Sequence, residues 1–213
     1  MVKLLIFDMD GTLIDTDEVL YKTWKELFEL YKSKDYKIER ELIRTFSGPP
    51  IEDSIARAFP EKDPHFILSE YRKRTAKYYD TDLKFFDNEK EVLNKLKEDG
   101  YILTIATSKN RPMTVKSLKV FGVYDLFSDM ITSSEDVAHK PNPDSLLLLM
   151  DKFNVKKEET LMIGDTSFDA LAARNAGVKS ILLKLCPRTY EKDKMPDYFV
   201  SSYSELYNLI KRF

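Results

Sequence analysis

Glutamine is absent from the 213 residues, and the chain has one cysteine, two histidines and six glycines. The lone Cys186 excludes an internal disulfide framework and a metal site built from several cysteines. No apolar run approaches the roughly 20 residues that span a bilayer. The run SLLLLM at 145–150 is far too short. No charged and then apolar leader precedes the first predicted strand, so we expect a cytoplasmic protein.

Neither sign of charge dominates, because 34 basic and 36 acidic residues leave a formal net charge of −2. These charges are well mixed along the chain, which favours neither nucleic acid nor a membrane surface as a partner. Abundant lysine and glutamate without glutamine is a composition found in heat-adapted proteins. The length suits one domain with a sizeable insertion, and we expect a monomer or homodimer that acts on a small molecule.

Short β-rich segments alternate with amphipathic helical segments over most of the chain. Strands are predicted at 3–7, 101–106, 130–132, 160–163, 179–183 and 198–200. Several are apolar on both faces, as in a parallel sheet covered by helices on both sides. Helices predicted at 89–99, 111–121 and 168–176 each end before a glycine. The pattern predicts an α/β fold whose core is a Rossmann-like, doubly wound parallel sheet.

One long interval between the first two strands shows helical periodicity and no strand pattern. Helices are predicted there at 17–31, 38–46, 51–59 and 63–79, with the turn SGPP at 47–50. We interpret residues 16–83 as an inserted α-helical cap domain. The remaining residues, 1–15 and 84–213, then form the α/β core domain.

Candidate functional residues gather where the predicted strands end, which is where open parallel sheets bind ligands. The strand ends carry Asp8 and Asp10, then Thr107, Ser108 and Lys109, then Lys140, then Asp165 and Asp169. If the strands are neighbours, three or four carboxylates share one crevice and require a cation. Carboxylate oxygens with a phosphate substrate suit Mg²⁺.

The chemistry that this arrangement favours is phosphoryl transfer to Asp8. Asp10 lies two residues on, on the same side of the extended chain, where it could give and take a proton. Thr107 would donate a hydrogen bond to a phosphoryl oxygen, and Lys140 would neutralise its charge. Each motif alone also has a structural interpretation as a cap or a solvated pair. A purely structural interpretation is harder to maintain for the full set, because the motifs follow one another in order at successive strand ends.

Four segments carry a resemblance to a known family: DMDGTLIDT, ATS, HKPNPD and GDTSFDALAARNAG. They look like the four successive motifs of the haloacid dehalogenase-like hydrolase superfamily, over nearly the whole chain. The helical insertion after the first motif resembles that family's first cap type. The overall pattern is similar to phosphoglycolate phosphatases and their relatives.

The resemblance implies a role for each matching residue. Asp8 is then the nucleophile and Asp10 the acid and base, while Thr107 and Lys140 bind the phosphate. We also nominate Ser108, next to Thr107, as a substrate-binding residue. Mg²⁺ would be held by Asp8, Asp165 and the Asp10 carbonyl. From its position one helical turn after Asp165, we expect Asp169 to hold Lys140 or a metal-bound water. The leaving group would be read by cap residues, for which we nominate Arg44, Ser47 and Gly48.

Two alternatives and the substrate remain open at this point. The β-phosphoglucomutase branch carries a cap histidine where this chain has Leu20, which disfavours a mutase. A phosphate-binding regulatory protein without turnover should have lost part of the catalytic set, which is intact here. Phosphoglycolate is the first substrate to test, beside nucleoside monophosphates, sugar phosphates and pyrophosphate.

Overall fold

The computed structural model describes residues 1–33 and 36–213, so positions 34–35 of the predicted insertion lie outside the described residues. Its strands are β1 (Leu4–Phe7), β2 (Ile102–Ala106), β3 (Phe127–Ile131), β4 (Thr160–Gly164), β5 (Lys179–Leu183) and β6 (Tyr198–Val200). Its helices are α1 (Asp17–Tyr31), α2 (Arg40–Arg44), α3 (Ile51–Ala58), α4 (Pro64–Asp82), α5 (Glu89–Glu98), α6 (Arg111–Val120), α7 (Asp144–Lys152), α8 (Ser167–Ala176) and α9 (Tyr203–Ile210). Short 3₁₀ turns occupy Tyr124–Leu126, Lys157–Glu159 and Lys192–Lys194.

The strands of the described residues form one parallel sheet in the order β3-β2-β1-β4-β5-β6. The strand order reverses beside β1, because β1 pairs with β2 on one side and with β4 on the other. Such a reversal opens a crevice at the carboxyl ends of the strands. The predicted α/β architecture is confirmed, and the ends of β1, β2 and β4 are adjacent.

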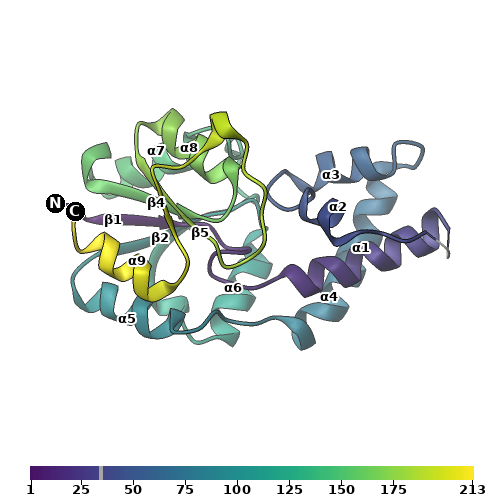
Figure 1. Cartoon of the computed structure of the whole chain (residues 1–213), viewed down its shortest axis with the longest axis horizontal. Coiled ribbons are helices and arrows are strands. Elements are labelled where there is room, and N and C mark those ends of the chain that lie inside the picture. Colours follow the sequence, from purple (N-terminus) through teal and green to yellow (C-terminus); the bar gives the residue numbers. More distant parts are fainter. Residues whose placement is uncertain (34–35) are drawn as a thin grey trace. The chain divides into compact units, whose positions relative to one another are not determined.

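Helices cover both faces of this sheet, with α7 and α8 on one face and α5 and α9 on the other (Figure 1). All four residues of β1 are buried, as expected for a central strand that has helices above and below it. On one face, Leu4 and Ile6 pack with Leu146, Leu149 and Met162. Burying side chains of this kind contributes about 1.5–3 kcal/mol each, so the site is built on a rigid base.

The structure corrects several predicted boundaries. β3 begins at Phe127 rather than at the predicted position 130. The apolar pattern missed this start because β3 is an edge strand, where Ser128 and Asp129 can be polar. Helix α2 spans only Arg40–Arg44, and α4 runs on to Asp82. Helices α7 and α9 were not predicted, although α7 contains the apolar run at 145–150.

The described residues divide into two compact units, Met1–Ile14 with Phe85–Phe213, and Asp15–Lys84. The second unit is a helical bundle with its own aromatic core. Trp24 lies at its centre, with its ring 4.3 Å from Phe46 and 5.4 Å from Tyr71, measured between centroids. This core gives the bundle a packing centre of its own.

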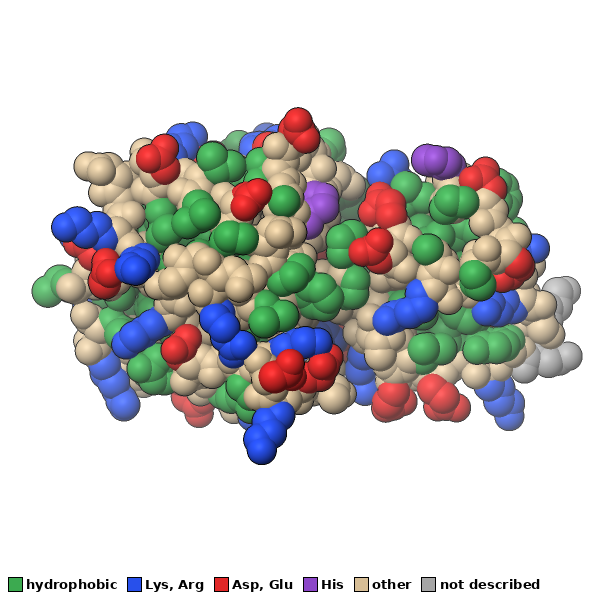
Figure 2. Space-filling model, turned by 90° about the horizontal axis from the view of Figure 1, so that it is seen from above, with side chains coloured by type: hydrophobic (Ala, Val, Ile, Leu, Met, Phe, Trp, Pro, Cys, Tyr) green, Lys and Arg blue, Asp and Glu red, His purple; other side chains and the backbone are tan. Residues whose placement is uncertain are grey.

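The surface of the protein is mixed in charge. Basic and acidic side chains lie interspersed on the face shown in Figure 2. None of the helices within the described residues is both long enough and apolar enough to cross a membrane.

Candidate active site

Asp8 lies directly after β1, at the point where the strand order reverses. Its backbone N–H donates to the Ile163 carbonyl of β4 at 2.8 Å, which fixes the start of the turn. Its side chain is buried, and Oδ1 accepts a hydrogen bond from Lys140 Nζ at 2.7 Å. Burial raises the pKa of Asp8 to about 6, although the Lys140 ammonium opposes the change. The Asp8 carboxylate is therefore largely shielded from solvent and lies beside the Lys140 ammonium group.

Lys140 links two carboxylates that come from different strand ends. Its buried Nζ also donates to Asp169 Oδ1 at 2.5 Å. Burial alone lowers the pKa of Lys140, but the carboxylates of Asp169 and Asp8 outweigh it and raise that pKa above its usual value. The other oxygen of Asp169 accepts the backbone N–H groups of Asp165 and Thr166, at 3.2 and 3.0 Å. Asp169 thus anchors both Lys140 and the turn into α8.

Two glycines leave room for these carboxylates. Gly11 has a φ of +82°, and a Cβ there would lie 2.1 Å from Asp165 Oδ2. A Cβ on Gly164 would lie 2.3 Å from Asp169 Cγ. A larger residue at either position would displace a carboxylate or strain the backbone.

Asp165, after β4, is fully buried and is held by the loop that follows β5. Arg188 Nε donates to Asp165 Oδ2 at 2.7 Å, and the Tyr190 hydroxyl donates to the Asp165 carbonyl at 3.1 Å. Burial raises the pKa of Asp165 to about 7, and the Arg188 guanidinium limits the rise. The other oxygen, Oδ1, is buried without a hydrogen-bond partner in the described part of the chain.

These carboxylates fit a divalent cation. Asp8, Asp165 and Asp169 each offer an oxygen, and the three oxygens lie within 4.8 Å of one another. Mg²⁺ prefers hard oxygen ligands of this kind, and the unsatisfied Oδ1 of Asp165 is a position where one would act. Both oxygens of Asp169 already accept hydrogen bonds, one from Lys140 and the other from the turn into α8, so Asp8 and Asp165 are the side chains that would hold the cation.

Asp10 does not join the carboxylate cluster through its side chain. Both of its oxygens accept hydrogen bonds from Lys109 Nζ, at 2.7 and 2.8 Å. The Asp10 side chain is 28% exposed, so it is the more accessible carboxylate of the pair after β1. The two acids of this pair therefore contact different ammonium groups, Asp8 that of Lys140 and Asp10 that of Lys109.

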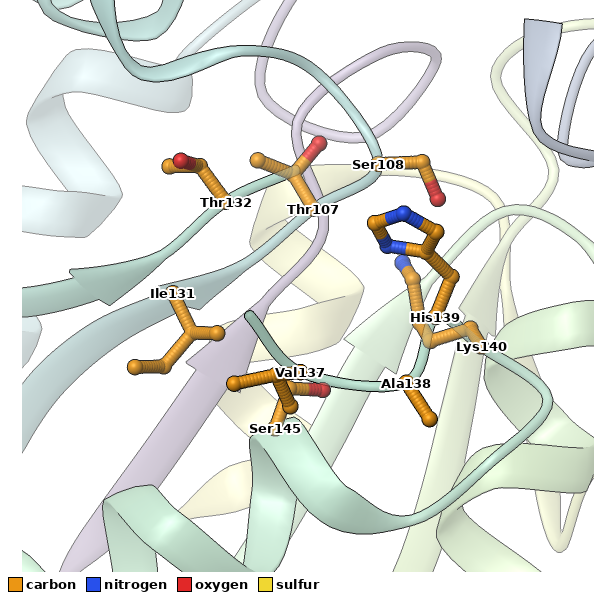
Figure 3. A pocket seen from close by; sticks show the side chains of 9 residues that line it. All are labelled: Thr107, Ser108, Ile131, Thr132, Val137, Ala138, His139, Lys140 and Ser145. Carbon is orange, nitrogen blue, oxygen red and sulfur yellow. The ribbon is translucent and has the colours of Figure 1, made fainter. Parts of the chain in front are cut away.

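A small pocket adjoins this cluster, between the ends of β2 and β3 and the Lys140 segment (Figure 3). Thr107, Ser108, His139 and Lys140 line it, so the predicted phosphate-binding side chains lie together. Ser108 Oγ is buried and has no hydrogen-bond partner among the residues that the structure covers. An anion that enters here would meet hydroxyl donors and one ammonium.

The three cap residues nominated from the sequence belong to the unit Asp15–Lys84. Within it, Arg44 pairs with Glu41 at 3.2 Å and lies 3.6 Å from Asp17. Ser47 and Gly48 form the turn after α2, where Gly48 has a φ of +105°. Their role in reading a leaving group stays a prediction.

Sequence reasoning missed the partners of two site residues. The sequence places Lys109 at the end of β2 but indicates no role for it. Arg188 and Tyr190 were not considered, although the loop after β5 leaves the same edge of the sheet as the others. Extending the search to the fifth strand end would have found Arg188.

Residues 5–183 match the family of haloacid dehalogenase-like hydrolases. The chain is 35% identical over 212 residues to a pyrophosphatase PpaX of Halalkalibacterium halodurans, covering 98% of this chain and 97% of that one. It is 31% identical over 214 residues to a pyrophosphatase PpaX of Bacillus mycoides, covering 99% and 98%.

Solved structures with lower sequence identity share the fold of this chain. A haloacid dehalogenase-like hydrolase of Streptococcus pneumoniae superposes with a TM-score of 0.85 at 23% identity, covering 98% of each chain. A protein described as a predicted phosphoglycolate phosphatase, from Haemophilus somnus, gives a TM-score of 0.82 at 23% identity, covering 98% of each chain. With the family match, these findings show that the chain is an enzyme of the haloacid dehalogenase-like hydrolase family.

Proposed function

We propose that this enzyme is a magnesium-dependent phosphatase that hydrolyses small phosphorylated metabolites through an aspartyl phosphate, an acyl phosphate formed on Asp8. One observation carries the proposal: a buried Lys140 bridges Asp8 and Asp169 beside an Asp165 oxygen that has no partner within the described residues. A structural salt bridge does not need a third buried carboxylate with an unsatisfied oxygen, whereas a cation site does.

In the first step an Asp8 oxygen attacks phosphorus, and the bond between phosphorus and the leaving oxygen breaks. Asp10 gives its proton to that oxygen. Lys140 neutralises negative charge on the transferred group, and Thr107 donates a hydrogen bond to it. Mg²⁺, when bound, supplies further positive charge for the phosphoryl oxygens.

In the second step water attacks the phosphorus of the phosphorylated Asp8. Asp10, now ionised, takes the proton from that water, and phosphate departs as Asp8 is regenerated. Asp10 suits both steps because its side chain remains accessible while Asp8 is buried. The two carboxylates therefore divide nucleophilic and proton-transfer chemistry between them.

Pyrophosphate is the substrate class that we propose first. The support is the similarity to two proteins named pyrophosphatase PpaX, at 35% and 31% identity over nearly the whole chain. Phosphoglycolate is the second candidate, because the motifs and insertion resemble phosphoglycolate phosphatases. The structural neighbour of that description supports the fold alone.

A substrate panel tests the proposal. Pyrophosphate, phosphoglycolate, a sugar phosphate, a nucleoside monophosphate and an aryl phosphate are each incubated with the enzyme, with Mg²⁺ or with a chelator. We expect phosphate release that requires Mg²⁺ and is lost in Asp8→Asn, which keeps the shape of the side chain but removes the nucleophile. Tight phosphate binding without turnover of any substrate would instead indicate a regulatory protein.

Two leaving groups separate the roles of Asp10. In Asp10→Ala an alkyl phosphate should fail at the first step, because its alkoxide needs a proton to leave. An aryl phosphate should pass the first step and stall at the second, so that phosphate accumulates on Asp8. Each step typically gains about 10²–10⁴ in rate from such proton transfer. Parent-rate hydrolysis of the aryl ester without a trapped intermediate would rule out Asp10 as the base.

A further inference from the structure

Arg188 is an unusual residue for a loop, because its side chain is 4% exposed and ends at a fully buried carboxylate. Its Nε donates to Asp165 Oδ2 at 2.7 Å. The tip of the guanidinium also lies against the turn after β1, since a Cβ on Gly11 would be 2.8 Å from Arg188 Nη2. Arg188 therefore places a permanent positive charge inside the acidic cluster.

The two oxygens of Asp165 are treated differently by the surrounding residues. Oδ2 accepts the hydrogen bond from Arg188, whereas Oδ1 is buried with no partner in the part of the chain described. Lys140 contacts Asp8 and Asp169 with its ammonium group. Arg188 is thus the cation assigned to the third acid of the cluster.

We propose that Arg188 is a positioning residue for the cation site: it fixes Asp165 through Oδ2, leaves Oδ1 for a divalent cation, and weakens the binding of that cation by its own charge. This inference rests on the proposed magnesium dependence. Arg188 stabilises the buried acid before the cation arrives, and the two positive charges then act on one carboxylate.

The direction of the effect follows from electrostatics. Two like charges a few ångströms apart in a buried site repel strongly, because little water screens them. Coupling between two interacting groups is reciprocal. If Arg188 lowers the affinity of the site for the cation, the bound cation must lower the contribution of Arg188 to folding stability by the same amount. Arg188 should therefore stabilise the cation-free protein more than the cation-bound protein.

The chain offers a matched control in Arg174. Its guanidinium donates to the carbonyls of Asp193 and Met195, at 2.7 and 3.0 Å, and so holds the later part of the same loop. Neither of these hydrogen bonds involves Asp165. Arg174→Met loosens the loop without removing the charge beside the carboxylate cluster.

Calorimetric titration of the full chain with Mg²⁺, without substrate, gives the primary test. We expect Arg188→Met to bind Mg²⁺ about tenfold or more tightly than the parent, because one competing charge is lost. Arg188→Lys, which keeps the charge, and Arg174→Met should bind as the parent does. An Arg188→Met affinity equal to or weaker than that of the parent would overturn the inference.

Thermal unfolding gives a second measurement. Arg188→Met should lower the melting temperature of the Mg²⁺-free protein more than that of the Mg²⁺-saturated protein, whereas a purely structural role would lower both equally. If Arg188→Met does not fold, Arg188→Gln keeps a donor for Asp165 without the charge and should still bind Mg²⁺ more tightly. A parent that binds no divalent cation refutes the proposed function as well, while equal binding by all variants refutes only the inference.

Discussion

Glu89 offers a quantitative test of the electrostatics of the α/β unit. It is the first residue of α5 and is fully buried. Its Oε2 accepts the backbone N–H of Phe86 at 3.2 Å, and its Oε1 has no partner among the described residues. Burial raises the pKa of Glu89 from 4.5 to about 9, although the Phe86 hydrogen bond opposes the rise. The folded protein should therefore keep this carboxyl protonated at neutral pH.

The sign of the effect on stability follows from linkage. A carboxyl whose pKa is higher in the folded state stabilises the protein fully below its unfolded pKa of 4.5, and that stabilisation is lost as the pH rises toward about 9. From the unfolded pKa of 4.5 to about pH 7 is an interval of roughly 2.5 pH units. At about 1.4 kcal/mol per unit, the free energy of unfolding falls by about 3 kcal/mol over that interval. Glu89→Gln does not titrate, so it escapes this loss.

The assay is chemical denaturation of the parent and of Glu89→Gln at about pH 5 and about pH 7, with the difference in unfolding free energy compared between the two pH values. The free energy of unfolding of Glu89→Gln, relative to that of the parent, should increase by a few kcal/mol as the pH rises. Glu91→Gln is the control, because Glu91 lies in the same helical turn but is exposed and paired with Lys95 at 2.7 Å. A Glu89→Gln difference that does not change with pH would mean that Glu89 is ionised in the folded protein.

Two further substitutions test other parts of the structure. Lys109→Met removes the ammonium group that bonds both Asp10 oxygens, so the Asp10 side chain loses the contact that orients it. The rate of alkyl phosphate hydrolysis, which needs a proton on the leaving oxygen, should fall severalfold relative to that of aryl phosphate hydrolysis. An unchanged ratio would separate Lys109 from proton transfer. Trp24→Ala empties the aromatic core of the helical unit and should cost about 3–5 kcal/mol of its stability. Hydrogen exchange should then increase within Asp15–Lys84, and uniform exchange over both units would contradict this placement of Trp24.

Apolar periodicity was enough to predict most of the architecture. β5 was predicted with the boundaries it has, because it is a short apolar segment after a glycine-capped helix. The same reasoning placed β3 late, because an edge strand buries only part of its length and Ser128 and Asp129 obscure the pattern. Helix α7 escaped prediction because its leucine run lacks the polar face of an amphipathic helix.

The residues of the site also fall into two groups, those that the sequence predicts and those that it does not. The residues of the four motifs could be placed at one edge because parallel strands end together. Arg188 follows no motif and reaches Asp165 only through the pairing of β4 with β5. Glu89 looks like a solvated first-turn acid in the sequence, and only packing around α5 makes it a buried group. The sequence pattern therefore does not predict contacts and burial that arise only from tertiary packing.

Phosphorylation of Asp8 is the claim on which the account depends most. The enzyme is mixed with radiolabelled pyrophosphate and Mg²⁺, quenched within the first turnover, and reduced with borohydride, which converts an acyl phosphate on aspartate to homoserine. Peptide mass spectrometry should find homoserine at position 8, and Asp8→Asn should give none. Turnover of the substrate without radiolabel on the quenched protein before reduction at any quench time, or with reduction at another residue, would contradict the account.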